Sequence, residues 1–442
     1  MKIHVLGHAS YVAVCRDGQI LLIDPALRSS HQEGLLAFYP ARTVLRRAIS
    51  APNCILLSHR HMDHFDAGSL AMLPRHVPVF CPRDGQMLGA LSSLGFTNVT
   101  QLGDWQEANA AGVTVVATRS LAEAPECGFI IDDGRTRIWN QVDTVVSPAI
   151  VERINRNFGE LDLALLRWQP LLDILPSNGG DVSFPYAAYA EILQTVSETR
   201  TRAMALGACG FRYRGAAAWI NHLAFPQSRA RAARDFRAMR RDRRTTVDVI
   251  DPGDIIDVTG KTARVRRNVS EFVRRRERWD DSQLMFCPWR PRWASMQRAP
   301  QSSAATLLRD VKRRLVAMLR HNTTLRELYR AWEVTYHLRV IGTAAADLFV
   351  DFSGKHIRFG STPFPGASIQ CFVKEAALRG VFRGDITWDR VVLGGDIFQW
   401  HRIYRLRRAQ MELPVQLEIP NPLFMIIDDA TAWNQYHAQR RV

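Results

Sequence analysis

Three histidines and an aspartate, all of them residues that bind metals, occur within six positions at residues 59–64. They follow the apolar run 54–57, and a strand that ends in a loop can direct such side chains toward one point. His59 and His61 lie on the same side of an extended segment, because side chains alternate with a period of two. Asp63 and His64 then need a turn to face the same way, and a second metal ion would use them as ligands. Three histidines in six positions are rare at average composition, so the segment predicts a metal site rather than a polar loop.

The spacing H-x-H-x-D-H after a hydrophobic strand resembles that of the metallo-β-lactamase superfamily. The resemblance implies an αββα sandwich with one or two metal ions at the edges of its sheets. It leaves the choice between a hydrolase and an oxygenase open, because the same fold hosts both activities.

Strands that alternate with helices must position this segment, and the hydrophobic pattern predicts such an α/β arrangement over residues 1–260. The turn sequence Asp251-Pro252-Gly253 predicts a closing pair of strands within residues 247–258. Strands are expected at residues 2–7, 11–14, 20–24, 77–81, 113–118, 128–131, 137–142, 161–166 and 203–209, and helices at 67–73, 85–94 and 186–200.

The length of 442 residues favours two or three domains. We expect a catalytic domain over residues 1–260, a basic connector over 261–303, and an α+β domain over 304–442 that covers the metal site. Residues 298–303 read as a linker. In the last domain, helices are expected at 306–320 and 324–338, the second with a capping box that starts at Thr324. A hairpin is expected at 348–352 and 356–359.

The bulk composition narrows the function classes. The formal net charge of +15 comes almost wholly from arginine; it indicates solvated basic faces or a partner such as nucleic acid, a phosphate-bearing substrate or a membrane surface. We prefer the first interpretation. The seven cysteines form no C-x-x-C pair and predict reduced thiols in the cytoplasm. No leader is expected, and no apolar run reaches the roughly 18–20 residues of a membrane span.

The family resemblance supplies further candidate ligands. Asp143 follows the strand expected at 137–142, where these folds place the carboxylate that bridges two metals. His222 lies on a later loop, where the last histidine ligand is usual. In the third motif, where hydrolases of this fold carry a histidine, this chain has Glu123, with Glu126 as the second choice. His8, in the turn Gly7-His8-Ala9-Ser10, is either a residue behind the ligands or a turn histidine.

The expected ligand set combines imidazoles with three carboxylates. One metal would be held by His59, His61, Glu123 and bridging Asp143, and the other by Asp63, His64, His222 and the same Asp143. Carboxylate in place of imidazole makes the site harder and more anionic, which favours two iron ions over two zinc ions.

Further stretches sharpen the resemblance, namely 161–168, 179–185, 207–213 and 388–389. Their order is similar to that of the nonheme diiron monooxygenases of this fold: CMP-N-acetylneuraminate hydroxylase, the chloramphenicol-pathway β-hydroxylase and the platensimycin-pathway diterpenoid monooxygenase. That family implies O₂-dependent hydroxylation of a C–H bond in a small biosynthetic intermediate, as in antibiotic pathways. The C-x-H and C-x-x-H motifs of a Rieske domain do not occur. A separate ferredoxin or reductase is therefore expected to supply electrons. Arginines within 227–298 could hold a phosphate-bearing handle such as coenzyme A.

Two other functions compete with this prediction. A dinuclear zinc hydrolase acting on a lactone or phosphodiester would use the metals to generate hydroxide. A non-catalytic protein that binds nucleic acid through its arginines is disfavoured, because it would have no need of an intact ligand set. Metal content discriminates between the two enzymes, and salt-sensitive binding would reveal the nucleic-acid protein.

Overall fold

The computed structural model describes residues 1–31, 34–49, 51–172, 175–176, 180–240, 244–260, 262–284, 304–342, 345–360, 366–414 and 419–426. The chain forms two compact units. The first comprises Met1–Asp173, Pro185–Leu284 and Arg408–Gln410, and the second comprises Ile174–Phe184, Met285–Arg407 and Met411–Val442.

An eight-stranded sheet carries the histidine-rich segment in the first unit. Its order is β19-β18-β1-β2-β3-β7-β8-β9. The strands from β19 to β3 run antiparallel, whereas β3, β7, β8 and β9 run parallel. The strands are β1 (Lys2–Gly7), β2 (Ser10–Val14), β3 (Ile20–Ile23), β7 (Cys54–Leu56), β8 (Val79–Pro82), β9 (Val99–Leu102), β18 (Ile255–Thr259) and β19 (Thr262–Arg266).

A seven-stranded sheet forms the second layer, in the order β10-β11-β12-β13-β14-β15-β17. Its first four strands are antiparallel and its last four are parallel, so that β13 belongs to both halves. The strands are β10 (Glu107–Ala110), β11 (Val113–Arg119), β12 (Cys127–Asp132), β13 (Arg137–Asn140), β14 (Leu163–Arg167), β15 (Ala203–Gly207) and β17 (Thr246–Val249).

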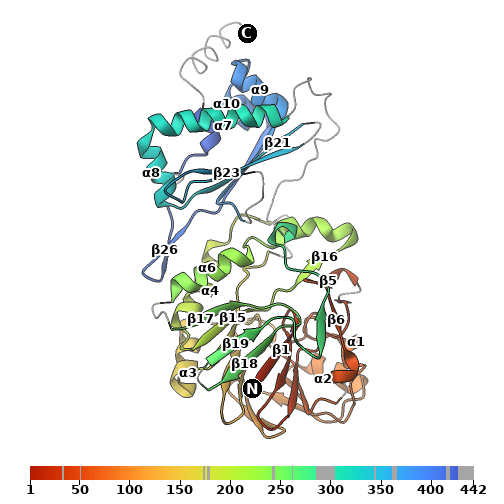
Figure 1. The fold of residues 1–442 in the computed structure, drawn as a ribbon. Helices are drawn as coiled ribbons and strands as arrows, with labels where there is room; N and C mark the ends of the chain where they lie inside the picture. Colours follow the sequence, from red (N-terminus) through yellow and green to blue (C-terminus); the bar gives the residue numbers. More distant parts are fainter. Residues whose placement is uncertain are drawn as a thin grey trace. The chain divides into compact units, whose positions relative to one another are not determined.

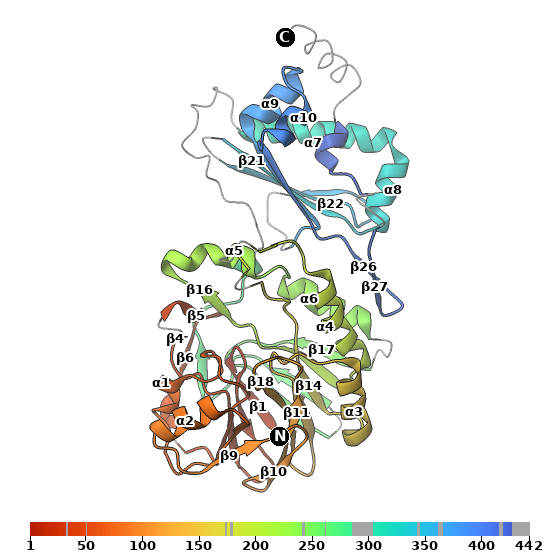
Figure 2. The same ribbon diagram turned by 180° about the vertical axis from the view of Figure 1, so that it is seen from behind.

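One apolar core lies between the two sheets, because alternate side chains of both point inward. It joins Ile3 and Leu21 of the first sheet to Val115 and Phe129 of the second. Helices cover the outer faces, with α1 and α2 on the first sheet and α3, α4 and α6 on the second (Figures 1 and 2). The helices of this unit are α1 (Ala67–Leu70), α2 (Gly85–Ser93), α3 (Pro148–Phe158), α4 (Tyr186–Glu198), the short α5 (Asn221–Ala224) and α6 (Arg229–Met239). The predicted αββα sandwich is confirmed.

Shorter elements complete this unit. Two small sheets are separate from the two main ones. They have the orders β16-β5-β4 and β20-β6. The shorter elements are β4 (Ser30–His31), β5 (Leu36–Phe38), β6 (Arg42–Val44), β16 (Phe211–Tyr213), β20 (Val273–Arg275) and the 3-10 helices η2 (Arg46–Ile49), η3 (Gly215–Ile220) and η4 (Asp281–Leu284).

The prediction that two strands within 247–258 pair with each other is wrong. Both strands exist, but β17 pairs with β15 in the second sheet and β18 pairs with β1 in the first. The turn at Gly253 therefore carries the chain from one layer to the other. The structure also places residues 262–284, the first part of the expected connector, in this unit, because β19 pairs with β18 and β20 pairs with β6. The expected linker at 298–303 lies outside the described residues.

The second unit is built on the five-stranded sheet β23-β22-β21-β24-β25. Its core joins the long helix α7 to the sheet through Leu315, Tyr336 and Cys371. The elements are α7 (Ala304–His321), α8 (Thr323–Ala331), β21 (Thr335–Ile341), β22 (Ala346–Asp351), β23 (Arg358–Gly360), β24 (Ile369–Lys374), α9 (Glu375–Arg383), α10 (Trp388–Leu393), β25 (Ile397–His401) and η5 (Pro422–Ile426). The strands β26 (Arg405–Arg407) and β27 (Gln410–Glu412) form a further two-stranded sheet.

The helix expected over 324–338 is too long. It ends at Ala331, and residues 335–341 form a central strand in which Tyr336, Leu338 and Val340 are buried with a period of two. The cap is also displaced, since the Asn322 side chain accepts the Leu325 N–H at 2.9 Å. The expected hairpin of β22 and β23 is confirmed.

The cysteines of the described residues are all buried, and none of them forms a disulfide bond. None of the helices in the described ranges has the length and hydrophobicity of a membrane span.

Candidate metal centre

The candidate site lies where strands of both sheets end. His8 follows β1, the histidine-rich segment follows β7, and Asp143 follows β13. The carboxyl ends of neighbouring parallel strands meet at one edge of a sheet, and such an edge is a usual place for ligands in α/β proteins. The fold thereby brings together side chains that are more than 130 positions apart in the sequence.

Two groups of side chains could each hold a metal ion, with ligand atoms all within 4.8 Å of one another. One is His59, His64 and Asp143, and the other is His8, Asp63 and His64. His64 Nε2 lies 3.5 Å from Asp143 Oδ2 and 3.6 Å from Asp63 Oδ2. His64 is thus the link between the two groups.

Asp24 orients His64 and was not among the residues expected from the sequence. Its Oδ2 lies 3.0 Å from His64 Nδ1 and also accepts the Ser58 hydroxyl at 2.7 Å. Its Oδ1 accepts the Ser58 N–H at 2.8 Å. Because His64 Nδ1–H donates to this buried carboxylate, the neutral ring carries its lone pair on Nε2, which faces Asp63 and Asp143. Such a carboxylate–histidine pair is the usual outer support of a metal-binding imidazole. The signal in the sequence was an aspartate directly after the apolar strand β3.

The Asp143 carboxylate fits a cation. Its Oδ1 is buried without a hydrogen-bond partner among the described residues, and it lies 3.9 Å from His59 Nδ1. A buried carboxylate oxygen that lacks a donor costs free energy unless a cation compensates it. The donor set of imidazole nitrogens and carboxylate oxygens suits a transition metal.

The electrostatics of the group also favour a bound cation. Burial alone would raise the pKa of Asp63 and Asp143, but His64 outweighs it and holds both pKa values well below their usual range. Burial likewise would lower the pKa of His64, yet Asp143 and Asp63 raise that pKa well above its usual range. Burial lowers the pKa of His59 to about 3. The site therefore keeps its carboxylates ionised and concentrates positive charge between them, where a metal can replace the proton.

His8 is placed as a hydrogen-bond donor rather than as a ligand. Its Nδ1 accepts the Gly210 N–H at 3.0 Å, so the proton of the neutral ring is on Nε2. That nitrogen lies 3.1 Å from Asp63 Oδ2 and cannot bind a metal while it carries the proton. The contact requires glycine at 210, because a Cβ there would lie 2.7 Å from the His8 backbone nitrogen. His8 thus holds the Asp63 carboxylate in position.

Replacing His8 with phenylalanine tests whether His8 is a hydrogen-bond donor to Asp63 or a metal ligand. Phenylalanine keeps the ring contact with Phe211 but removes the donor to Asp63. We expect metal affinity to fall by about 10- to 100-fold, as it does when other residues that hydrogen-bond to a metal ligand are replaced. The number of ions bound per chain at saturating metal should not change. Metal titration followed by elemental analysis measures both quantities. Loss of one ion per chain at saturation would instead make His8 a ligand, and His64→Phe is the comparison variant that is expected to lose one.

The two candidate glutamates differ in burial. Glu123, the first choice from the sequence, has an exposed side chain. Glu126 is half-buried, and its Oε1 accepts from the Ser120 hydroxyl and from the Val145 N–H at 3.3 Å. Burial raises the pKa of Glu126, and the negative charge of Asp143 adds to this. Glu126 therefore lies within electrostatic range of the site, three residues later than expected.

The two remaining expected ligands differ in their placement. His61 Nδ1 lies 2.9 Å from His59 Nε2, so His61 stands at the exposed side of the site. His222 lies in α5 with an exposed side chain and belongs to neither group of potential ligands. His222 as a ligand therefore stays a prediction from the sequence.

Arg167, at the end of β14, supplies a positive charge that was not anticipated. Its guanidinium donates to the Asp143 backbone carbonyl at 3.3 Å. Burial lowers the pKa of Arg167, and the carboxylates of Asp143 and Glu126 oppose that shift. The arginine therefore partly balances the negative charge that gathers at this edge.

Comparison with known proteins agrees with this architecture. A family model described as "Beta-lactamase superfamily domain" matches residues 20–204. The chain is 24% identical over 197 residues to "Putative Rieske 2Fe-2S iron-sulfur protein" of Mycobacterium tuberculosis, which covers 41% of this chain and 38% of that protein. The chain thus spans well under half the length of this relative.

Two solved structures are similar to part of this chain. CmlA, a diiron β-hydroxylase from Streptomyces venezuelae, is 21% identical with a TM-score of 0.37 over 47% of this chain and 45% of that chain. An isothiocyanate hydrolase from Delia radicum gut bacteria is 19% identical with a TM-score of 0.42 over 59% of this chain and all of that chain.

Proposed function

From the beta-lactamase superfamily domain that this chain carries, we propose that the protein is a dinuclear iron monooxygenase that hydroxylates a C–H bond of a small molecule. The ligands would be drawn from three histidines and three carboxylates at the sheet edge. Four of them, His59, Asp63, His64 and Asp143, belong to the two groups of potential ligands. The other two, His61 and Glu126, belong to neither group and are proposed from the sequence motifs.

The position of Glu126 carries this proposal. Hydrolases that this fold resembles use a histidine in the third motif, and no histidine occurs between His76 and His222 in this chain. A half-buried carboxylate stands there instead, within range of Asp143 and His61. A site with three carboxylates is harder and more anionic than an imidazole-rich one, which suits iron better than zinc.

The chain's own residues would prepare the site for this chemistry. Two iron ions held here would supply O₂ activation, in the balance R–H + O₂ + 2 e⁻ + 2 H⁺ → R–OH + H₂O. Asp24 fixes His64 with Nε2 toward the ligands, and His8 keeps a proton at Nε2 beside Asp63. Arg167, which donates to the Asp143 backbone carbonyl, offsets part of the carboxylate charge.

The two electrons must come from a donor outside this chain, and a ferredoxin or a Rieske-type protein is the proposed class. The chain lacks the paired C-x-H and C-x-x-H motifs of a Rieske centre. Its relative from Mycobacterium tuberculosis bears a Rieske name but is matched over 38% of its length only. An electron donor of that kind would complete the reaction.

Three of the arginines within 227–298 that could hold a coenzyme A handle are instead paired with aspartates of the fold. Arg229 and Arg275 both pair with Asp251, at 2.6 and 2.7 Å. Arg267 pairs with Asp254 at 2.7 Å. These arginines hold the turn between the two layers, so they are engaged in the fold.

Elemental analysis of protein expressed without added metal tests the proposal. We expect iron near two ions per chain, with charge-transfer absorption that bleaches when a chemical reductant is added without air. Two zinc ions per chain, together with turnover of a lactone or phosphodiester, would contradict it and establish the hydrolase.

A further inference from the structure

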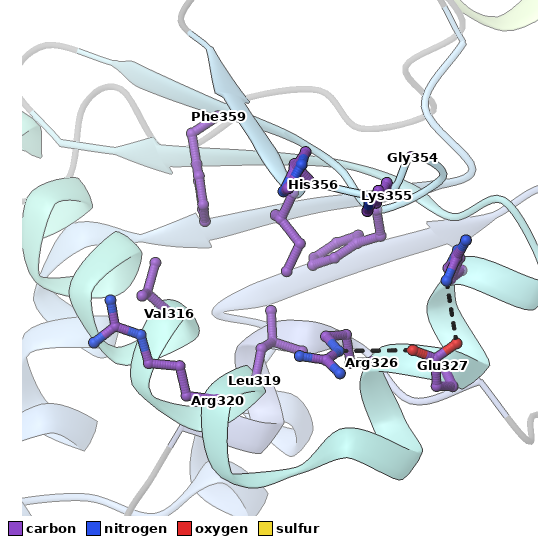
Figure 3. A pocket seen from close by; sticks show the side chains of 12 residues that line it. Val316, Leu319, Arg320, Arg326, Glu327, Gly354, Lys355, His356 and Phe359 are labelled. Atoms are coloured by element: carbon purple, nitrogen blue, oxygen red, sulfur yellow. Dashed lines mark ion pairs between the residues drawn. The ribbon is translucent and has the colours of Figure 1, made fainter.

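A cavity of about 520 Å³ lies within the second unit, whereas the candidate metal site belongs to the first unit. It is bounded by α7, α8 and the β22–β23 hairpin, whose side chains face one another across it (Figure 3). This volume lies within the range of about 300–1,000 Å³ that is usual for pockets that bind small molecules. The helices and the hairpin are joined by the core of this unit, so the cavity belongs to one folded body.

The floor of the cavity is apolar. Leu319 and Phe352 are each 2% exposed and form its base. Val316, Ile357 and Phe359 line the walls and are half-buried, so parts of these side chains remain open to the cavity. An occupant that covers them would gain roughly 25 cal/mol for each Å² of apolar surface removed from water.

The rim of the cavity is positively charged. Arg320, Arg326, Arg330 and Lys355 line it, and Glu327 is the acidic residue among the lining side chains. Glu327 Oε1 lies 3.8 Å from Arg326 Nε, and Glu327 Oε2 lies 3.6 Å from Arg330 Nη1. The single negative charge of Glu327 is therefore shared by two arginines. Within the described part of the chain, Arg320 and Lys355 form no ion pair. The rim therefore keeps an excess of positive charge over an apolar floor.

We propose that this cavity binds an amphipathic anion, a ligand with an apolar chain and a carboxylate or phosphate head group. The chain would lie on the floor formed by Leu319 and Phe352. The head group would reach Arg320 and Lys355, because charge-assisted hydrogen bonds to carboxylates and phosphates are the strongest that these side chains form. The proposal is independent of the metal site and of the proposed reaction.

Fluorescence titration of the full chain with a dansyl-labelled undecanoic acid tests the inference. We expect a blue-shifted, saturable signal that is displaced by dodecanoate or dodecyl phosphate. Dodecanol and dodecyltrimethylammonium should compete at least about tenfold less well, because they lack the anion. The more potent of the two anions identifies the head group. Equal competition by dodecanol, or no saturable signal, would overturn the proposal.

Variants locate the binding to this cavity. The double change Arg320→Glu and Lys355→Glu is expected to weaken binding by about tenfold or more. Ile357→Trp, which fills the cavity, should weaken it by a similar factor. Arg309→Glu, an exposed position on the same helix that hydrogen-bonds Thr306 instead, is the matched control and should bind as the unchanged protein does.

The variant Glu327→Gln distinguishes a specific effect on the cavity from a general loss of folding. Removing the negative charge frees Arg326 and Arg330 from their ion pairs, so binding of the anion should tighten by about two- to fivefold. A folding defect cannot produce a gain in affinity. Unchanged binding in the double variant, or no gain in Glu327→Gln, would overturn the assignment.

Discussion

Asp143→Asn is expected to abolish tight metal binding. The two side chains have the same shape, but the amide removes the charge that lies between His59 and His64. The loss in affinity should exceed the roughly 10–100-fold that outer-shell changes cost, because a ligand itself is removed. Competitive titration against a chelator of known affinity measures the change.

The same variant should lose the stabilisation that metal gives to the fold. A ligand at about a thousand times its Kd stabilises the folded state by about 4 kcal/mol, so a chelator should lower the stability of the unchanged protein by that order. The chelator should leave Asp143→Asn unaffected. Asp248→Asn, in β17 of the same sheet, is the control and should respond as the unchanged protein does. Normal metal content in Asp143→Asn would show that Asp143 is not a metal ligand.

Glu126→His is expected to convert the metal preference from iron to zinc. The change restores an imidazole at the third motif, where it replaces a half-buried carboxylate near Asp143 and His61. With one negative charge fewer, the site should hold Fe(III) less well, and imidazole suits zinc. After loading from an equimolar mixture, we expect the zinc-to-iron ratio to rise by about tenfold. Charge-transfer absorption should fall with it.

Glu123→His is the matched control, three residues earlier on the same loop. Its exposed side chain should leave the zinc-to-iron ratio unchanged. The reverse outcome, a shift in Glu123→His and none in Glu126→His, would return the ligand to the position first expected from the sequence. If neither variant shifts the ratio, the carboxylate argument for iron fails and the zinc hydrolase becomes the better proposal.

The sequence predicted most of the first unit because its strands are short apolar runs bounded by turns. It misjudged the strands on either side of Gly253, because a turn sequence shows that the chain reverses but not which sheet each strand joins. Residues 335–341 were assigned to a helix, although Tyr336, Leu338 and Val340 repeat with the period of a strand. Here the preceding helix pattern concealed the change of period.

The candidate site was predictable where spacing alone decides, as in His59, His61, Asp63 and His64. Asp24 was missed because its role depends on a contact with a histidine 40 positions away, which no local pattern reveals. The choice between Glu123 and Glu126 depended on how the loop before β12 enters the strand. That geometry follows from the Ser120 and Val145 contacts of Glu126, and these were not accessible from residue types.

The position of β1 between β2 and β18 determines when the first sheet can be completed. Lys2 pairs with Asp257, so the partner strand is synthesised about 250 residues later. At about 5–20 residues per second, β1 waits roughly 10–50 s on the ribosome with one edge unpaired. The unpaired N–H and C=O groups along such an edge can pair with a strand of another chain, which leads to aggregation.

A truncated fragment that ends at residue 204, where the family match ends, would keep the edge of β1 unpaired permanently, because it lacks β17, β18 and β19. Fragments of this domain should therefore extend at least through β19 to be recovered without aggregation.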